Sequence, residues 1–215
     1  MLSTKKLKEN QRSLLLGSGI SLVEYDAIKI DFVPFEIPQQ VENAIFTSQN
    51  AVLSVQGSAG SIQNCFCVGE KTKLLLEENG FKVVKMTEYA SELSDYLVQH
   101  HKNDFFHFFC GNIRSDEIPS KLKKNNIAFE EIIVYNTILR PKKFERDFDA
   151  ILFYSPSGVR SYFKMNNSIS NKTIAVCIGT TTASEARNYV ENVVISNSTT
   201  VESVIAKAVN SLINI

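Results

Sequence analysis

Short apolar runs alternate with stretches of helical periodicity along the chain. The runs are rich in β-branched and aromatic residues and predict strands at 22–30, 44–47, 65–68, 82–85, 105–110, 129–135, 150–154, 173–178 and 192–196. Amphipathic patterns between them predict helices, the clearest at 72–79, 90–99, 120–125, 182–190 and 200–213. Strands that alternate with helices predict an α/β protein with largely parallel sheets.

The second half of the sequence repeats features of the first half at a nearly constant spacing. Pairs related by a shift of 110 residues are Cys67 and Cys177, Gly69 and Gly179, Thr72 and Thr182, Val83 and Val193, and Glu92 and Glu202. Upstream, segments 46–52 and 153–159 are similar at a shift of 107 residues. This internal repeat predicts two similar α/β units.

The first helix and strand, up to about residue 33, precede the first unit and do not complete it. If they complete the second unit, the chain crosses between domains twice, near 33–38 and near 136–142. Each crossing contains proline, which favours an extended connector. We therefore expect two open parallel-sheet domains of flavodoxin or Rossmann type, with a two-stranded connector and an inter-domain cleft. The expected boundaries are 1–33 plus 139–215 for the discontinuous domain, 38–135 for the inserted domain, and 34–37 and 136–138 for the crossings.

Composition and charge exclude several classes of protein. The 215 residues are 44% hydrophobic, as in globular proteins, and 23 Lys and Arg balance 23 Asp and Glu, which argues against a nucleic-acid-binding surface. The basic clusters Lys5-Lys6 and 121–124 are interpreted as solvated surface. No apolar run approaches the roughly 18 residues of a membrane span, and the N-terminus lacks a signal-peptide core. We expect a cytoplasmic protein with neither nucleic-acid nor membrane partners.

The cysteines and histidines do not form a metal-binding pattern. Cys65 and Cys67 lie in an apolar predicted strand, and no second cysteine pair supplies zinc-finger spacing. His100 and His101 close a predicted helix, and His107 lies in an apolar run. We therefore expect buried, reduced cysteines, no metal site and no catalytic histidine.

In each unit, predicted strands end in hydroxyl-bearing residues that lead directly into helix starts. Segments 47–50 and 155–158 form one pair, and 69–72 and 179–182 form the other. Such turns expose backbone N–H groups at the positive end of a helix, where anions bind, and they lie at the carboxyl ends of strands. Ser, Thr and Asn are also the usual N-caps of helices, so capping is the alternative role. The absence of a P-loop or Gly-x-Gly-x-x-Gly motif counts against nucleotide binding.

A set of short motifs spans nearly the whole chain in a characteristic order. The motifs are FTSQNAV at 46–52, VGEKT at 68–72, CGNIR at 110–114 followed by IP at 118–119, VYNT at 134–137, YSPSGV at 154–159, IGTTTA at 178–183 and TTVE at 199–202. In order and spacing, this set resembles the uroporphyrinogen-III synthase family. The chain departs from the family in having Ser198 where Pro is common and in lacking Gly after Glu202, and both changes fall in a turn.

The resemblance implies a monomeric, cofactor-free lyase of tetrapyrrole (haem) biosynthesis. Such an enzyme cyclises hydroxymethylbilane to uroporphyrinogen III, with inversion of ring D and loss of water. In the family's chemistry, loss of the terminal hydroxyl gives an azafulvene, which the substituted carbon of ring D attacks to form a spiro intermediate. The competing hypothesis is a non-enzymatic, two-lobed binding module for a small anion.

The resemblance also implies which residues form the site. Tyr135 matches the family's tyrosine in VYNT and is the candidate proton donor, with a partly buried structural tyrosine as the alternative. For Arg114, an ordinary salt bridge is the alternative to a substrate contact. The candidate substrate-binding residues are Thr47, Ser48, Asn50, Thr72, Gly111, Asn112, Arg114, Ser155, Ser157, Gly158, Thr181 and Thr182.

Overall fold

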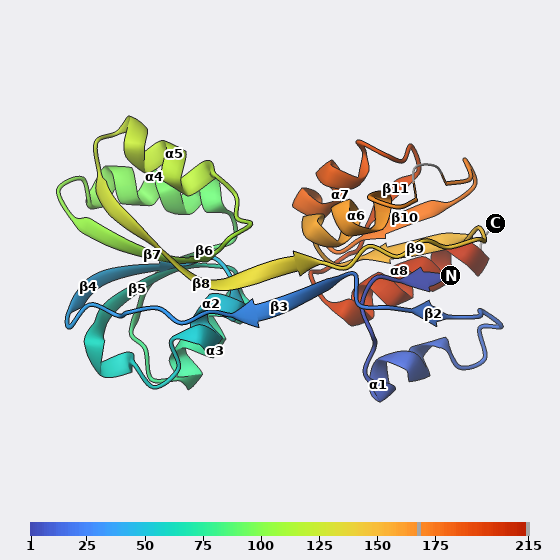
Figure 1. Cartoon of the computed structure of the whole chain (residues 1–215), viewed down its shortest axis with the longest axis horizontal. Coiled ribbons are helices and arrows are strands. Elements are labelled where there is room, and N and C mark those ends of the chain that lie inside the picture. Colours follow the sequence, from blue (N-terminus) through green and yellow to red (C-terminus); the bar gives the residue numbers. More distant parts are fainter. Residues whose placement is uncertain (167–168, 214–215) are drawn as a thin grey trace. The chain divides into compact units, whose positions relative to one another are not determined.

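The computed structural model describes residues 1–166 and 169–213 (Figure 1). The chain divides into two compact units. Met1–Lys29 and Ile138–Ile215 form one, called the discontinuous unit below, and Ile30–Thr137 form the other, called the inserted unit. Each unit is an α/β structure with its own sheet.

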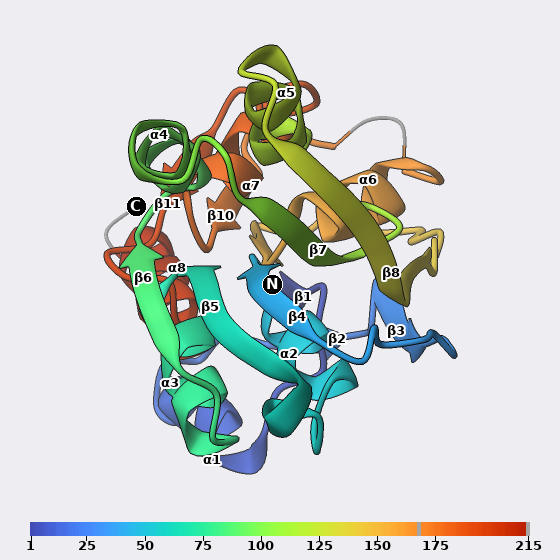
Figure 2. The same ribbon diagram turned by 90° about the vertical axis from the view of Figure 1, so that its left-hand side faces the viewer.

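The inserted unit contains a six-stranded sheet in the order β3-β8-β7-β4-β5-β6, which Figure 2 shows with helices above and below it. The strands are β3 Ile28–Phe32, β4 Val41–Phe46, β5 Ile62–Val68, β6 Val83–Thr87, β7 Phe105–Gly111 and β8 Ala128–Leu139. The pairings from β8 through β6 are parallel. The helices are α2 Gln49–Ser54, α3 Glu70–Glu78, α4 Ala90–His100 and α5 Glu117–Lys124, with the short 3-10 turn η2 Ala59–Ser61. Helices α2 and α3 pack on one face and α4 and α5 on the other, so both faces are buried.

The discontinuous unit contains a five-stranded parallel sheet in the order β11-β10-β9-β1-β2. Its strands are β1 Leu2–Ser3, β2 Val23–Glu24, β9 Ala150–Phe153, β10 Ile174–Cys177 and β11 Val193–Ile195. Its helices are α1 Glu9–Arg12, α6 Pro156–Phe163, α7 Thr180–Ala186 and α8 Val201–Ile213, with the 3-10 turn η1 Ser13–Leu15. Apolar residues of α6 and α7 cover one face of the sheet, and those of α8 cover the other.

The predicted α/β class with largely parallel sheets is confirmed, and the two sheets share one strand order. Taken in that order, strands β6-β5-β4-β7-β8 of the inserted unit correspond to strands β11-β10-β9-β1-β2 of the discontinuous unit. The N-terminal strands β1 and β2 therefore occupy the places that β7 and β8 hold in the other sheet. The repeat seen in the sequence is thus a repeat of sheet topology. In the discontinuous unit, the beginning of the chain supplies the last two strands of the sheet.

The unit boundaries lie on two strands that are neighbours in the sheet, β3 and β8. The backbone N–H of Arg140 donates to the carbonyl of Ala27 at 2.8 Å, and the N–H of Val33 donates to the carbonyl of Val134 at 3.2 Å. The division falls after Lys29 in β3 and after Thr137 in β8, whereas the expected crossings were 34–37 and 136–138.

Several local predictions need correction. The expected strand 22–30 is two strands, β2 and β3, with an interruption between them. Strand β1 is only two residues long, too short for a periodic pattern, and was not predicted. Helices α3 and α7 each begin two residues earlier than expected, because Gly69 and Gly179 occupy the N-cap positions.

All four cysteines are buried free thiols, as predicted. Among the residues described, no group of three or more His, Cys, Asp or Glu side chains is placed to hold a metal ion. Within that same part of the chain, no helix is both long and apolar enough to cross a membrane.

The buried thiols predict a loss of stability at alkaline pH. Burial raises the pKa of Cys65, Cys67 and Cys177 from 9.0 to about 12, and that of Cys110 to about 11. Because the folded pKa values are raised, these thiols contribute stability that is complete below the unfolded pKa and is lost as the pH rises through the folded pKa. We expect the free energy of unfolding to fall by about 1 kcal/mol per thiol between about pH 7.5 and about pH 10.

Urea denaturation at both pH values measures this fall. Cys177→Ala is the matched variant, because it lacks one titrating thiol and should show a smaller fall than the wild-type chain. An equal fall in both proteins would contradict the assignment.

Candidate functional site

In the inserted unit, the candidate residues gather at the carboxyl ends of three adjacent strands. Ser48 follows β4, Gly111 ends β7 and Tyr135 lies on β8, and these strands are neighbours in the order β8-β7-β4. Thr47 and Asn50 flank Ser48 in the turn that leads into α2. The sheet thus brings together residues that are up to 88 positions apart in the sequence.

The ring of Tyr135 lies directly over Gly111. The two residues are register partners on β8 and β7, and the side chain of Tyr135 is buried, at 7% exposure. A Cβ atom on Gly111 would lie 2.5 Å from both Cε2 and Cζ of the ring and 2.9 Å from its hydroxyl oxygen. Real Cβ contacts do not come this close, so the ring occupies space that any other residue at 111 would fill.

The side chain of Ser48 lies near the hydroxyl of Tyr135. Ser48 is the N-cap of α2, and its Oγ accepts the backbone N–H of Asn50 at 3.2 Å. Burial raises the pKa of Tyr135, the neighbouring Ser48 side chain opposes that rise, and nearby Cys110 adds to it. The net rise keeps the phenol protonated at neutral pH, which makes it a hydrogen-bond donor and not a base.

Asn112 fixes the backbone of β8 beside Tyr135. Its backbone N–H donates to the carbonyl of Tyr135 at 3.2 Å, and its side-chain oxygen accepts the N–H of Thr137 at 2.7 Å. Asn112 is exposed, and because its amide oxygen already accepts a hydrogen bond, its amide nitrogen is the side-chain group left for a ligand.

Arg114 forms the salt bridge that the sequence left as the alternative. Its Nη2 lies 2.5 Å from Oε1 of Glu131, its Nε lies 3.1 Å from Oε2 of the same residue, and its Nη1 lies 2.9 Å from Oδ1 of Asp116. Hydrogen bonding to Glu131 raises the pKa of Arg114. Two carboxylates therefore more than offset the guanidinium charge, which leaves little attraction for a further anion.

In the discontinuous unit, Ser155 caps α6 directly after β9. Its Oγ accepts the backbone N–H of Gly158 at 3.0 Å, and Ser157 and the buried Gly158 occupy the second and third helical positions. A Cβ on Gly158 would lie 3.4 Å from the Ser155 oxygen and 3.6 Å from Oγ1 of Thr4. The capping role applies to Ser155, as it does to Ser48.

The candidate threonines of α3 and α7 do not cap their helices. Thr72 and Thr182 are the third residues of α3 and α7, and Thr181 is the second residue of α7, because Gly69 and Gly179 are the N-caps. Thr72 and Thr182 are buried, whereas Thr181 is exposed. The shift of 110 residues thus places Thr72 and Thr182 at equivalent positions of equivalent helices.

The position of Lys5 and Lys6 near a strand end was not predicted. These residues, interpreted as solvated surface, follow Thr4 after β1, which lies between β9 and β2. Both side chains are exposed, and this is the end of a parallel sheet at which ligands bind. The internal repeat implied a strand here, because the discontinuous unit needs a counterpart of β7. A strand of two residues, however, shows no hydrophobic period in the sequence.

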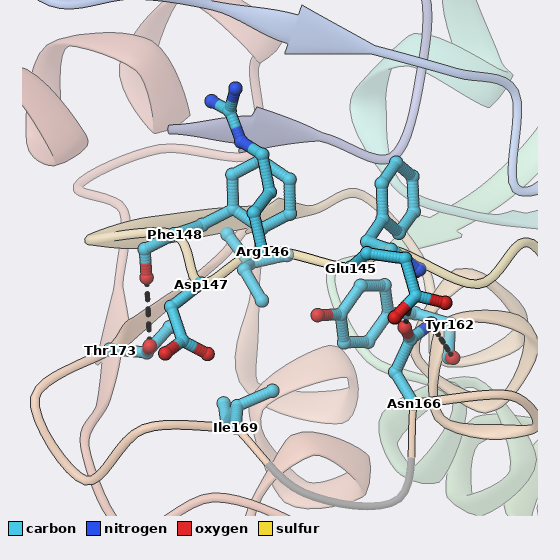
Figure 3. Close-up of a pocket in the computed structure, with 10 residues that line it drawn as sticks. Glu145, Arg146, Asp147, Phe148, Tyr162, Asn166, Ile169 and Thr173 are labelled. Carbon is cyan, nitrogen blue, oxygen red and sulfur yellow. Dashed lines mark hydrogen bonds between the residues drawn. The ribbon is translucent and has the colours of Figure 1, made fainter.

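A cavity of about 210 Å³ lies at the opposite end of the sheet in the discontinuous unit (Figure 3). Phe148 and Thr173, which line it, precede β9 and β10, and Oγ1 of Thr173 donates to the carbonyl of Phe148 at 2.7 Å. Asn166 donates to the carbonyl of Tyr162 at 2.8 Å and accepts the N–H of Phe144 at 3.0 Å. These polar groups hold the loops together, and no candidate site residue lines the cavity.

Comparisons with known proteins point to one family. The family described as uroporphyrinogen-III synthase HemD matches residues 10–206. The porphyrin biosynthesis protein HemD of Ruminiclostridium josui is 31% identical over 104 residues, which are 44% of this chain and 21% of that protein. The match therefore spans about a fifth of the length of this curated relative.

Solved structures of the same description share the fold. Uroporphyrinogen-III synthetase from Helicobacter pylori 26695 superposes with a TM-score of 0.69 at 15% identity, with 98% of each chain covered. A mutant uroporphyrinogen III synthase from the extremely thermophilic bacterium Thermus thermophilus superposes with a TM-score of 0.72 at 15% identity, with 100% of this chain and 99% of that chain covered. At this identity the likeness shows the fold, and it extends over both units.

The distinction between capping and non-capping hydroxyls predicts two different effects on stability. Ser155→Ala removes the acceptor for the N–H of Gly158 and should lower the free energy of unfolding by about 1 kcal/mol. Thr181→Ala is the matched control, because Thr181 is exposed and is not the N-cap, and its effect should stay within about 0.5 kcal/mol. Urea denaturation of both variants measures the difference, and equal losses would contradict the assignment of the cap.

Proposed function

We propose that this chain, which belongs to the uroporphyrinogen-III synthase family, cyclises hydroxymethylbilane to uroporphyrinogen III with inversion of ring D and loss of water. The observation that carries the proposal is the family match over residues 10–206, a range that includes Tyr135 and every candidate substrate-binding residue. The monomeric state and the cytoplasmic location stay predictions.

In the first step, the terminal hydroxymethyl group of the bilane loses its oxygen. The C–O bond breaks as the lone pair of the adjacent pyrrole nitrogen forms a C=N bond, and the departing hydroxyl takes up a proton and leaves as water. Tyr135 assists by donating a hydrogen bond to the departing oxygen, a role that suits a phenol with a raised pKa. The substrate's own pyrrole supplies the electrons, so the step calls for no cofactor.

In the second step, the azafulvene carbon reacts with the substituted carbon of ring D. A new C–C bond to that carbon gives the spiro intermediate. The bond that previously joined the same carbon of ring D to the rest of the bilane then breaks, and reclosure gives the inverted ring. A proton lost from carbon at the end restores the aromatic pyrrole. The bilane also closes without an enzyme to the uninverted isomer, so the protein must favour the spiro-forming geometry over direct closure.

The protein can position the bilane by binding its carboxylate side chains. The chain has no net charge, so we assign their binding to local groups within each unit. In the inserted unit these are the turn at Thr47–Asn50 and the start of α3 at Thr72. In the discontinuous unit they are the starts of α6 and α7 at Ser155 and Thr181, where helix N–H groups attract anions.

The proposal predicts the isomer that the protein produces. With hydroxymethylbilane as substrate, the wild-type chain should give the III isomer, whereas buffer alone gives the I isomer. Oxidation of the products to porphyrins and chromatographic separation of the isomers measure the ratio. Bilane binding without any excess of the III isomer would favour the non-enzymatic binding module instead.

Loss of the Tyr135 hydroxyl should slow turnover without abolishing it. General-acid assistance typically contributes about 10²–10⁴-fold, and neighbouring hydroxyls or water can substitute, so Tyr135→Phe should lower kcat by up to about 10²-fold. The raised pKa adds a pH test: the ratio of wild-type to variant kcat should stay constant from about pH 6 to about pH 9, because the phenol remains protonated. Wild-type turnover by the folded variant would remove Tyr135 from the mechanism.

A further inference from the structure

We infer that Gly111 and the irregular pairing of β7 with β8 form a seat that fixes the phenol of Tyr135, so that Gly111 is a positioning residue that acts through Tyr135. This inference rests on the proposed function, because it assigns to the seat the task of holding the proton donor. It also gives Gly111 a different role from the substrate contact that the family resemblance implies.

The register of β7 and β8 shifts at the seat. Cys110 pairs with Ile133, but Gly111 pairs with Tyr135, so Val134 is an extra residue on β8. In a regular strand, Val134 and Tyr135 would point to opposite faces of the sheet. Both instead pack in the same buried cluster, on the face covered by α2 and α3. The bulge therefore turns the phenol toward the side on which Ser48 lies, as bulges near functional sites often do.

The extra residue is held by two hydrogen bonds. The carbonyl of Val134 accepts the N–H of Val33 at 3.2 Å and the hydroxyl of Ser54 at 3.2 Å. Beyond it, Asn112 binds the backbone of Tyr135 and Thr137. The backbone of β8 is thus fixed on both sides of the bulge, which leaves the side-chain torsions of Tyr135 as the remaining freedom.

Gly111 and Ser48 restrict that freedom. The ring fits because residue 111 has no Cβ, whose position would be 2.5 Å from Cε2 and Cζ of the ring. Glycine in a strand is otherwise unfavourable, since it costs backbone entropy and contributes no packing. The side chain of Ser48, itself held as the cap of α2, lies near the hydroxyl. The phenol is thus confined at its face by Gly111, with Ser48 beside its oxygen.

Gly111→Ala tests the seat directly. The clashing atoms belong to the far end of the tyrosine side chain, so the methyl group should push the phenol aside and leave the sheet intact. Gly60→Ala is the matched control, because a Cβ at Gly60 meets nothing within 4 Å and the residue has no positive φ. Gly60 lies in the same unit, in η2.

Two measurements on the intact chain follow the displacement. In protein with ¹³C-labelled tyrosine, the Cζ resonance that disappears in Tyr135→Phe identifies Tyr135. That resonance should shift in Gly111→Ala and stay in place in Gly60→Ala. In the isomer assay, Gly111→Ala should lower kcat to about the level of Tyr135→Phe, with KM changed by less than about twofold, because the lost interaction acts in the transition state.

A double variant separates positioning from general damage. In the Tyr135→Phe background, Gly111→Ala should lower kcat no further, since the hydroxyl it displaces is already absent. If Gly111→Ala does not fold, Ser48→Ala and Ser48→Thr replace it, and the threonine variant, which keeps a hydroxyl, should lose less kcat than the alanine variant.

The outcomes distinguish this inference from the proposed function. An unmoved Tyr135 resonance with wild-type kcat in Gly111→Ala would overturn the inference, as would a further fall of kcat in the double variant. Failure of the wild-type chain to form the III isomer would instead overturn the proposed function, and the resonance would still show whether Gly111 fixes the phenol.

Discussion

Parallel strand pairing is the constraint on which the rest of this structure depends. A parallel strand can follow its neighbour only after a crossover along one face of the sheet, so every strand ends at the same edge, in a turn that leads away into a helix or loop. Two such ends, at Ser48 and Gly111, meet Tyr135 of β8 because β4, β7 and β8 are adjacent. The candidate site is therefore a consequence of sheet order. Separate turns become neighbours only when the strands pair.

The same constraint explains the discontinuous unit. Its sheet needs strands beyond β9 on the side away from β10, and the start of the chain supplies them as β1 and β2. Although β1 has only two residues, Leu2 is completely buried, and the carbonyl of Leu152 on β9 accepts both the N–H and the hydroxyl of Thr4. A short strand suffices here because neighbours on both sides satisfy its backbone. The exposed Lys5 and Lys6 reach a strand end as a result.

The sequence predicts the features that depend on period and repetition, and it does not predict those that depend on pairing. The α/β class, the parallel sheets and the equivalence of Thr72 with Thr182 follow from patterns along the chain. Strand β1 does not, since two residues show no period. The salt bridge of Arg114 depends on Glu131, which a loop and a helix separate from it in sequence. The bulge at Val134 exists only in the register between two strands, so no pattern along one strand reveals it.

Hydroxyl groups, and not charges, form the centre of the candidate site in the inserted unit. A buried carboxylate or ammonium requires a partner of opposite charge, and even the partly exposed Arg114 is already paired with Glu131 and Asp116. A phenol avoids this problem, since burial stabilises the neutral form that carries the proton. The phenol must, however, be oriented toward the group that accepts its hydrogen bond, because a neutral donor acts only along its O–H bond. A close-packed seat of the kind formed by Gly111 supplies that orientation without introducing a charge.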